Sequence, residues 1–301
     1  MASMRDIKRR KTSIQSTQQI TKAMKLVSTV KLQRAKTRAE QCKNYSTKMY
    51  ETIVSMMERS GYIDHPYMKP NGSDKKAVIL ITSNRGLAGG YNSNVTKLVT
   101  QKSDWNVEDV VIYAIGKKGR DTIKRYGYEI AYDNSDVINE PIFSDASEIV
   151  AQLLDQYSKG EIGEIYLAYT VFKNTVVHVP TLQKLVPLGM NEPEVGSVAG
   201  DTASELSAEE ISARRALMTY EPSEDEALNL IIPKYVTSLI YGALIEAVAS
   251  ENGARMQAMD SATDNAEKMI SGLELQYNRA RQGAITQELT EIIGGADALS
   301  S

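Results

Sequence analysis

Apolar and small residues recur every three or four positions through the first sixty residues, and no glycine or proline occurs between 3 and 58. Helix-forming residues dominate this stretch, so the pattern predicts one long α-helix. Its second half has the four-three spacing of a coiled-coil seam, at Ala35, Ala39, Cys42, Ser46, Met49, Ile53 and Met56. The small side chains in this seam predict close approach of a partner helix with modest burial. At ~1.5 Å per residue the helix would be roughly 80 Å long.

Runs of apolar, β-branched residues alternate with helical stretches in the middle of the chain. The predicted strands are 78–82, 110–115, 128–132 and 165–172, with a further β-rich stretch at 175–179. The predicted helices follow the glycine-rich turn 86–90 and cover 117–126 and 147–157. Strands and helices that alternate at this spacing are typical of an α/β unit with a mostly parallel sheet.

Helical spacing returns in the last third of the chain, from about Ser223 to Ile293. Ser223 and Glu226 fit a capping box, and Pro233 should kink or restart the helix. Small and apolar residues form a stripe along this helix at Ala243, Ala247, Ala254, Ala258, Ala262, Ala266, Met269 and Leu273. Several of the steps between them are of four residues, which predicts a slack supercoil. Two long helices with one narrow seam each bury those seams best against each other. We therefore predict an α/β fold class combined with a long antiparallel α-helical coiled coil, with a central Rossmann-like α/β domain inserted between the helices.

This pattern divides the chain into five segments. They are an N-terminal helix (1–60), a linker (61–75), the central α/β domain (76–188), an acidic insertion (189–216), and a C-terminal helix (217–301) that pairs with the first. The acidic stretch at 189–213 is interpreted as a mobile insertion with no assigned role. The final stretch, 278–298, is polar on nearly all sides, which is typical of a helix whose partners are other chains.

Charge is distributed unevenly along the chain. Residues 1–38 carry eleven Lys or Arg and one acidic residue, Asp6, so this part has a net charge of +10, against −3 for the whole chain. A basic arm indicates an acidic partner: nucleic acid, anionic lipid or an acidic protein surface. Cys42 is the only cysteine, which excludes an intrachain disulfide and a cysteine-based metal cluster. We find neither an apolar run of the ~18–20 residues that a membrane span needs nor a secretion signal, and expect a cytoplasmic compartment.

Candidate catalytic chemistry is sparse. The turn SNRGLAGGYNSN (83–94) follows a strand and precedes a helix, where a phosphate could bind. Its Gly-x-x-Gly-Gly spacing matches neither the dinucleotide fingerprint nor a Walker loop, so a structural turn is preferred here, as at the basic helix start 116–120. His65 and His178 are too isolated for a metal site or a catalytic triad. We therefore expect no cofactor, no metal and no catalytic residue, and a scaffolding or mechanical role.

The two ends of the chain and the central turn together resemble the γ subunit of bacterial F-type ATP synthases. The resemblance rests on 7–35, which includes Ile20-Thr21-Lys22-Ala23-Met24, on TSNRGLAGGYN (82–92), and on 249–298, which ends in Ile285-Thr286-x-Glu288-x-x-Glu291…Gly295-Ala296-x-Ala298. It covers nearly the whole chain and is weakest at 189–213. Photosynthetic members of this family carry a regulatory cysteine pair, and this chain has only Cys42, so thiol switching of that type is excluded.

The resemblance implies a rotor. One copy of a non-catalytic subunit would stand inside a ring of alternating α and β subunits, on the membrane c-ring and beside the ε subunit. Proton flow would turn it, and its asymmetry would drive the nucleotide states of β, where the catalytic sites lie. The chain would be peripheral, at the cytoplasmic face of the cell membrane, with its basic arm facing acidic loops on β. The residues implied in rotor contact or coupling are Met24, Lys25, Arg255, Arg281, Gln282, Thr286 and Glu288.

Two other interpretations remain open. A nucleic-acid-binding coiled coil would use the basic arm, but it should place aromatic or arginine base readers near the charge, and Tyr45 is the first aromatic residue. A small α/β nucleotide-binding enzyme would use the turn at 86–90, and its nucleotide binding would depend on Gly86 and Gly89.

Overall fold

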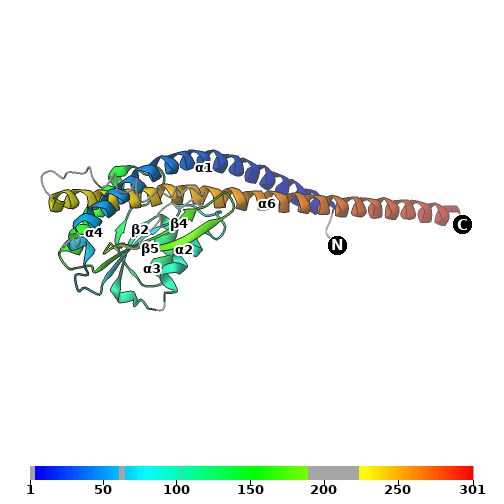
Figure 1. Cartoon of the computed structure of the whole chain (residues 1–301). Coiled ribbons are helices and arrows are strands. Elements are labelled where there is room, and N and C mark those ends of the chain that lie inside the picture. Colours follow the sequence, from blue (N-terminus) through cyan, green and yellow to red (C-terminus); the bar gives the residue numbers. More distant parts are fainter. Residues whose placement is uncertain (1–3, 61–64, 103, 189–223, 301) are drawn as a thin grey trace. The chain divides into compact units, whose positions relative to one another are not determined.

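The computed structural model describes residues 4–60, 65–102, 104–188 and 224–300 (Figure 1). Its elements in chain order are α1 (Met4–Ser60), η1 (Pro66–Met68), β1 (Lys76–Ile81), α2 (Tyr91–Thr100), η2 (Val107–Asp109), β2 (Val110–Ile115), α3 (Lys117–Arg125), β3 (Glu129–Asp133), α4 (Phe143–Ser158), β4 (Glu164–Phe172), β5 (His178–Val186) and α6 (Glu224–Ser300). The chain forms two compact units, one of Met1–Ser28 with Met256–Ser301 and one of Thr29–Arg255. The five segments expected from the sequence are a different division and stay a prediction.

In the first unit, the start of α1 and the end of α6 pair in opposite directions. Lys11 Nζ lies 2.7 Å from Glu274 Oε1, and Lys25 Nζ lies 2.5 Å from Asp260 Oδ1. Fourteen residues separate the two lysines, and fourteen separate the two acidic residues in the reverse direction. The two ion pairs are therefore equally spaced along the two helices but in opposite directions, and the antiparallel coiled coil is confirmed.

The buried line along α6 corrects the predicted stripe. Met269 is 48% exposed, whereas Met259, Thr263, Ala266 and Leu273 are buried. Successive steps of four drift around a helix that has 3.6 residues per turn, so a stripe of fours leaves the contact line. The steps along the observed line are four, three and seven residues, and the line includes a polar residue, Thr263, that the apolar pattern missed.

The second unit is built on a five-stranded sheet of order β3-β2-β1-β4-β5. The first four strands are parallel, and β5 pairs antiparallel with β4. One face packs against side chains from α1, α4 and α6, and the other against side chains from α2 and α3. Because both faces are covered, all residues of β1 from Ala77 to Ile81 are fully buried. This is why the strand is a continuous apolar run instead of an alternating one.

A glycine makes the close turn from β2 into α3. Gly116 has φ +102°, and a Cβ at this position would overlap the carbonyl oxygen of Thr82. The turn brings the first residues of α3 to the end of β1, where the Gly119 N–H donates to Thr82 Oγ1 at 2.8 Å. A residue with a side chain would have to push these two segments apart.

Several expectations about local structure are corrected. The last strand begins at His178 and runs to Val186, because Asn174 Oδ1 accepts the N–H groups of Val176 and Val177 and holds them in a turn. The helix α6 continues through Pro233, since core packing of neighbours such as Ile232 and Val236 outweighs the missing hydrogen bond. The expected capping residue Ser223 lies outside the described residues.

The helix α6 is also apolar enough to meet the length and composition criteria for a membrane span. Its described part, Glu226–Ile293, contains an 18-residue window of mean hydropathy 1.4, which the sequence analysis overlooked. However, 61% of that window is buried inside the fold. Burial of this extent is what the core helix of a folded domain shows.

Candidate functional site

The end of α6 beyond its pairing with α1 is uncovered. Every described side chain from Arg281 to Ile293 is exposed, including the predicted contact residues Gln282, Thr286 and Glu288. Side-chain hydrogen bonds in this stretch lie within the helix itself: Thr286 Oγ1 donates to the Gln282 carbonyl at 2.9 Å. These side chains are therefore presented to the surroundings on all sides.

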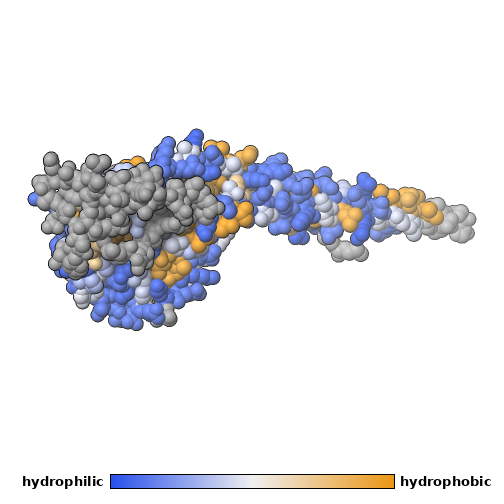
Figure 2. All heavy atoms as spheres, in the orientation of Figure 1, coloured by the Kyte–Doolittle hydropathy of each residue, from blue (hydrophilic) through white to orange (hydrophobic). Residues whose placement is uncertain are grey.

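This end also carries an exposed apolar stripe, although the sequence analysis treated it as polar. Ile285, Leu289 and Ile292 are 49%, 54% and 63% exposed. Their spacing of four and three places them on one face of the helix. Hydrophobic and hydrophilic residues accordingly adjoin each other along the exposed length of the helix (Figure 2).

A second exposed apolar surface lies on α1, around two other predicted contact residues. Ile20, Leu26 and Val27 are all more than half exposed, and Met24 and Lys25 lie between them in sequence and are half-buried. The Lys25 ammonium group is bound to Asp260 of α6, with the two side chains 41% and 50% exposed. An ion pair this exposed contributes ~0.2–1 kcal/mol to stability.

A buried hydroxyl pair sets the register near this surface. Thr21 Oγ1 and Thr263 Oγ1 are 2.7 Å apart, and the two residues are 8% and 6% exposed. Each hydroxyl has a single proton, so one of them donates across the pair while the other donates to a carbonyl of its own helix, that of Gln18 for Thr21 or that of Met259 for Thr263. A polar pair in an otherwise apolar seam favours one register, because a shifted register would leave the hydroxyls unpaired between the helices.

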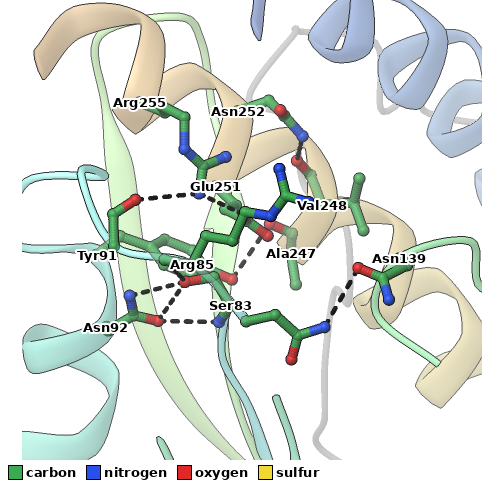
Figure 3. Close-up of polar contacts among 12 residues, drawn as sticks. Ser83, Arg85, Tyr91, Asn92, Asn139, Ala247, Val248, Glu251, Asn252 and Arg255 are labelled. Atoms are coloured by element: carbon green, nitrogen blue, oxygen red, sulfur yellow. Dashed lines mark hydrogen bonds and ion pairs between the residues drawn. The ribbon is translucent and has the colours of Figure 1, made fainter. Parts of the chain in front are cut away.

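Arg255 is placed differently from the other predicted contact residues. It is 9% exposed, and its guanidinium lies 2.6 Å from Glu251 Oε1 and 3.4 Å from the Gly86 carbonyl (Figure 3). The ion pair and Tyr91 lie together, since the charges of both Glu251 and Arg255 act on the Tyr91 hydroxyl. Burial, followed by the Glu251 charge, raises the Tyr91 pKa well above its ordinary value.

The glycine-rich turn uses its polar groups inside the fold. The Ser83 N–H donates to Asn92 Oδ1 at 2.9 Å, and Ser83 Oγ donates to the Arg85 carbonyl at 2.6 Å (Figure 3). Tyr91 Oη donates to the Ala247 carbonyl of α6 at 3.2 Å. These bonds connect β1, the turn and α6, and they support the interpretation of a structural turn.

The two histidines have structural surroundings. His65 Nδ1 accepts from the Tyr67 N–H, and His65 Nε2 lies 3.0 Å from Asn229 Oδ1 of α6. His178 packs on the Phe172 ring at a centroid distance of 5.9 Å. Across the described ranges, no group of three His, Cys, Asp or Glu residues is placed to hold a metal ion.

Solved structures show the class of fold to which this chain belongs. It is similar to a chain in a structure described as "Cryo-EM structure of Euglena gracilis mitochondrial ATP synthase, OSCP/F1/c-ring, rotational state 3", with TM-score 0.62 and 17% identity over 98% of this chain and 94% of that one. It is also similar to a chain of a Tetrahymena thermophila mitochondrial ATP synthase described as central stalk/c-ring, with TM-score 0.56 and 22% identity over 81% of this chain and 99% of that one. The fold is that of a chain of an ATP synthase central stalk.

Sequence comparisons are more specific. A family model described as "ATP synthase" matches residues 3–299. The ATP synthase gamma chain of Lachnoclostridium phytofermentans is 62% identical over 300 residues, covering 100% of both chains. A chain of Acetobacterium woodii described as "ATP synthase gamma chain, sodium ion specific" is 42% identical over 299 residues, covering 99% of both. This chain belongs to the ATP synthase gamma chain family.

Proposed function

We propose that this chain is the rotor of a membrane-bound ATP synthase and transmits torque between an ion-driven ring in the membrane and a catalytic ring. The observation that carries the proposal is the uncovered end of α6, where every residue from Arg281 to Ile293 is exposed. An exposed helix end with apolar and polar residues side by side is suited to a sleeve formed by other chains.

The exposed residues are suited to contacts that form and break. Burying a Leu or Ile side chain completely contributes ~1.5–3 kcal/mol. Ile285 and Leu289 are about half exposed, so only the exposed half of each side chain remains to be buried. Each would therefore contribute roughly 1 kcal/mol to binding when the helix enters a sleeve. The polar side chains of Arg281, Gln282, Thr286 and Glu288 would exchange hydrogen bonds of ~0.5–1.5 kcal/mol each with successive partners. Contacts of this size hold the helix in place and still allow it to turn.

The surface on α1 would provide a second contact. Met24 and Lys25 lie among exposed apolar residues in the basic arm, which would face acidic loops of the catalytic β subunits. Arg255 would act indirectly, because its guanidinium is already bound to Glu251 and the Gly86 carbonyl. Its role would be to hold the glycine-rich turn against α6.

The remaining assignments follow from family membership. We infer that one copy of the chain stands in a ring of α and β subunits, with the catalytic sites on β, and binds ε and the c-ring. It would be peripheral, at the cytoplasmic face of the membrane. One relative is described as sodium ion specific, so we infer that the coupled ion is either H⁺ or Na⁺. Pumping measured with and without Na⁺ distinguishes the two ions.

Reconstitution tests the proposal. The full chain is assembled with α, β, ε and the membrane ring in sealed vesicles, and ATP hydrolysis and ion pumping are measured together. We expect Met24→Lys to lower the ions pumped per ATP more than it lowers hydrolysis, because it adds a charge at the moving contact. Met269→Lys adds the same charge at an exposed site on α6 and serves as the control.

The outcomes separate two levels of the proposal. If no complex forms, or if turnover is indifferent to the chain, the rotor function is wrong. If Met24→Lys leaves pumping per ATP unchanged, or if Met269→Lys impairs it equally, the contact assigned to Met24 is wrong while the rotor function stands.

A further inference from the structure

Buried polar groups without a hydrogen-bond partner occur on two strands and one helix of the second unit. The buried side-chain atoms without a hydrogen-bond partner, among the residues that the structure describes, belong to β4, β5 and α6: Tyr169 Oη, Thr170 Oγ1, His178 Nδ1 and Nε2, Gln183 Nε2 and Glu246 Oε2. Buried polar groups are nearly always hydrogen-bonded in folded proteins. Tyr169 belongs to the core on the α6 face of the sheet, whereas Thr170, the next residue of β4, points to the other face. Each exception therefore calls for its own explanation.

Glu246 is the only acidic residue among those with such an unpartnered atom. It is 7% exposed, and its helical neighbours Ile245 and Ala247 are 2% and 0% exposed. The Phe172 backbone N–H donates to its carboxyl group, while its second oxygen has no partner. The carboxyl group thus lies between α6 and the end of β4, in apolar surroundings, with one oxygen that has no hydrogen-bond partner.

Few charged or titratable groups act on Glu246. Tyr169 of β4 faces it, since the carboxylate charge raises the pKa of this phenol further than burial alone. Lys43 of α1 is the only cation in the described part that acts on the carboxyl group, and this lysine is exposed to solvent. His178 of β5 lies beside Phe172, and burial lowers its pKa. An ionised Glu246 would therefore be a buried carboxylate without a close counter-charge, which is strongly unfavourable.

We propose that Glu246, with Tyr169 as its polar neighbour, is an internal proton-binding site that makes the packing of α6 on the β4–β5 hairpin sensitive to pH near neutrality. The site takes one proton from solvent when the carboxylate becomes a carboxylic acid, and returns it to solvent as the pH rises. The neutral acid is accommodated in the core. The carboxylate draws water between α6 and β4 and loosens this contact. The inference is independent of the rotor function.

The direction of the pH effect follows from burial. Desolvation raises the Glu246 pKa from 4.5 to about 7, against a smaller opposing effect of Lys43. Between these two values the folded chain holds a proton that the unfolded chain has released, so stability is full below pH 4.5 and falls as the pH rises to about 7. The loss amounts to up to tenfold per pH unit in the folding constant, or roughly 300-fold in all.

The test compares the full chain with Glu246→Gln, which imitates the protonated acid. Unfolding by urea is measured from pH 5 to pH 9 for the wild type, for Glu246→Gln, and for Glu267→Gln, which makes the same change at an exposed position of α6. We compare the ratio of the Glu246→Gln folding constant to the wild-type folding constant at two pH values. We expect this ratio to be at least ~30 times larger at pH 8.5 than at pH 5. Glu267→Gln should follow the wild type throughout. The comparison cancels the titration of His178, which all three chains share.

Infrared spectroscopy provides a readout that does not depend on unfolding. With ¹³C-labelled glutamate, a protonated carboxyl band should persist in the wild type above pH 6, disappear as the pH rises towards 8, and be absent from Glu246→Gln. Tyr169→Phe should move this transition to higher pH, because loss of the phenol hydroxyl makes the surroundings of the carboxylate less polar. The proposal would be overturned if the ratio of the wild-type folding constant to that of Glu246→Gln did not change with pH, or if the protonated carboxyl band were absent at pH 6. An unmoved transition in Tyr169→Phe would remove Tyr169 from the site.

Discussion

Replacing Arg255 by Met would break the most deeply buried ion pair that the structure describes. The side chains of Arg255 and Glu251 are 10% and 12% exposed, with 2.6 Å between the guanidinium nitrogen and the carboxylate oxygen. Met preserves the length and much of the volume of the arginine stem but removes its charge. Glu251 would then be a carboxylate in a nearly dry environment, and the Gly86 carbonyl would lose its contact with Arg255.

The expected size of the effect depends on this burial. Breaking a buried ion pair by removing one partner destabilises a protein by ~3–5 kcal/mol, whereas a solvent-exposed pair contributes ~0.2–1 kcal/mol. Lys25→Met is the matched control, because Lys25 and Asp260 are equally close but 41% and 50% exposed. We expect Arg255→Met to lower the free energy of unfolding by about 3 kcal/mol or more and Lys25→Met to lower it by less than about 1 kcal/mol.

The assay is urea unfolding of the full chain at pH 7, followed by circular dichroism. The double variant Arg255→Met/Glu251→Leu completes the cycle, and it should recover most of the loss because no unpaired charge is left behind. If Arg255→Met were no more destabilising than Lys25→Met, the guanidinium would not be a structural element, and the role assigned to it behind the glycine-rich turn would be wrong.

Three further changes test other parts of the fold. Thr263→Val should lower the free energy of unfolding by about 1 kcal/mol, since Thr21 loses its partner across the helix pair. The double variant Thr21→Val/Thr263→Val should restore most of this loss. Thermal melting would measure both variants, and additive losses would contradict the pairing. Gly116→Ala should lower the free energy of unfolding by ~2 kcal/mol or more, because the added Cβ meets the backbone at a residue with positive φ. Gly72 also has a positive φ but has open space around it, so Gly72→Ala should lower the free energy of unfolding by about 1 kcal/mol. Equal losses would refute the steric argument. His178 has a lowered pKa because it is buried, so the unfolded chain binds its proton first, and this residue lowers stability as the pH drops below 6.5. In urea unfolding, the ratio of the wild-type folding constant to that of His178→Gln should therefore be lower at pH 5.5 than at pH 7.5, and this ratio cancels the opposite effect of Glu246; a ratio that does not change with pH would contradict the effect of burial on His178.

Local spacing was sufficient to predict most elements of the fold. The absence of glycine and proline from the first helix, the apolar runs of β1 and β2, and the alternation of strands and helices each depend on residues close together in the chain. Physical forces of short range, such as helix propensity and side-chain periodicity, act on the same neighbours. The last strand was misplaced because Asn174 captures the backbone of Val176 and Val177, a side-chain contact that hydrophobicity does not report.

The candidate site was only partly predictable, for the same reason. The exposed end of α6 was foreseen from its polar residues, but the apolar stripe of Ile285, Leu289 and Ile292 was not, because an apolar residue at helical spacing reads equally well as core. Arg255 could be recognised by resemblance, yet nothing local predicted that its guanidinium would lie beside Gly86, 169 residues away in the chain.

The sequence by itself determined most of the helices and strands, their order along the chain, the basic charge of the first segment and the family. Only the tertiary structure decided which polar residues are removed from water: Thr21 finds a partner 242 residues away, Arg255 is enclosed with Glu251, and Glu246 is buried while the cation that acts on it, Lys43, is exposed to solvent. The physical reason is that burial and pairing depend on segments far apart in sequence that share one core. The free energy of a charge or hydroxyl is set by that surrounding core, and not by its neighbours along the chain.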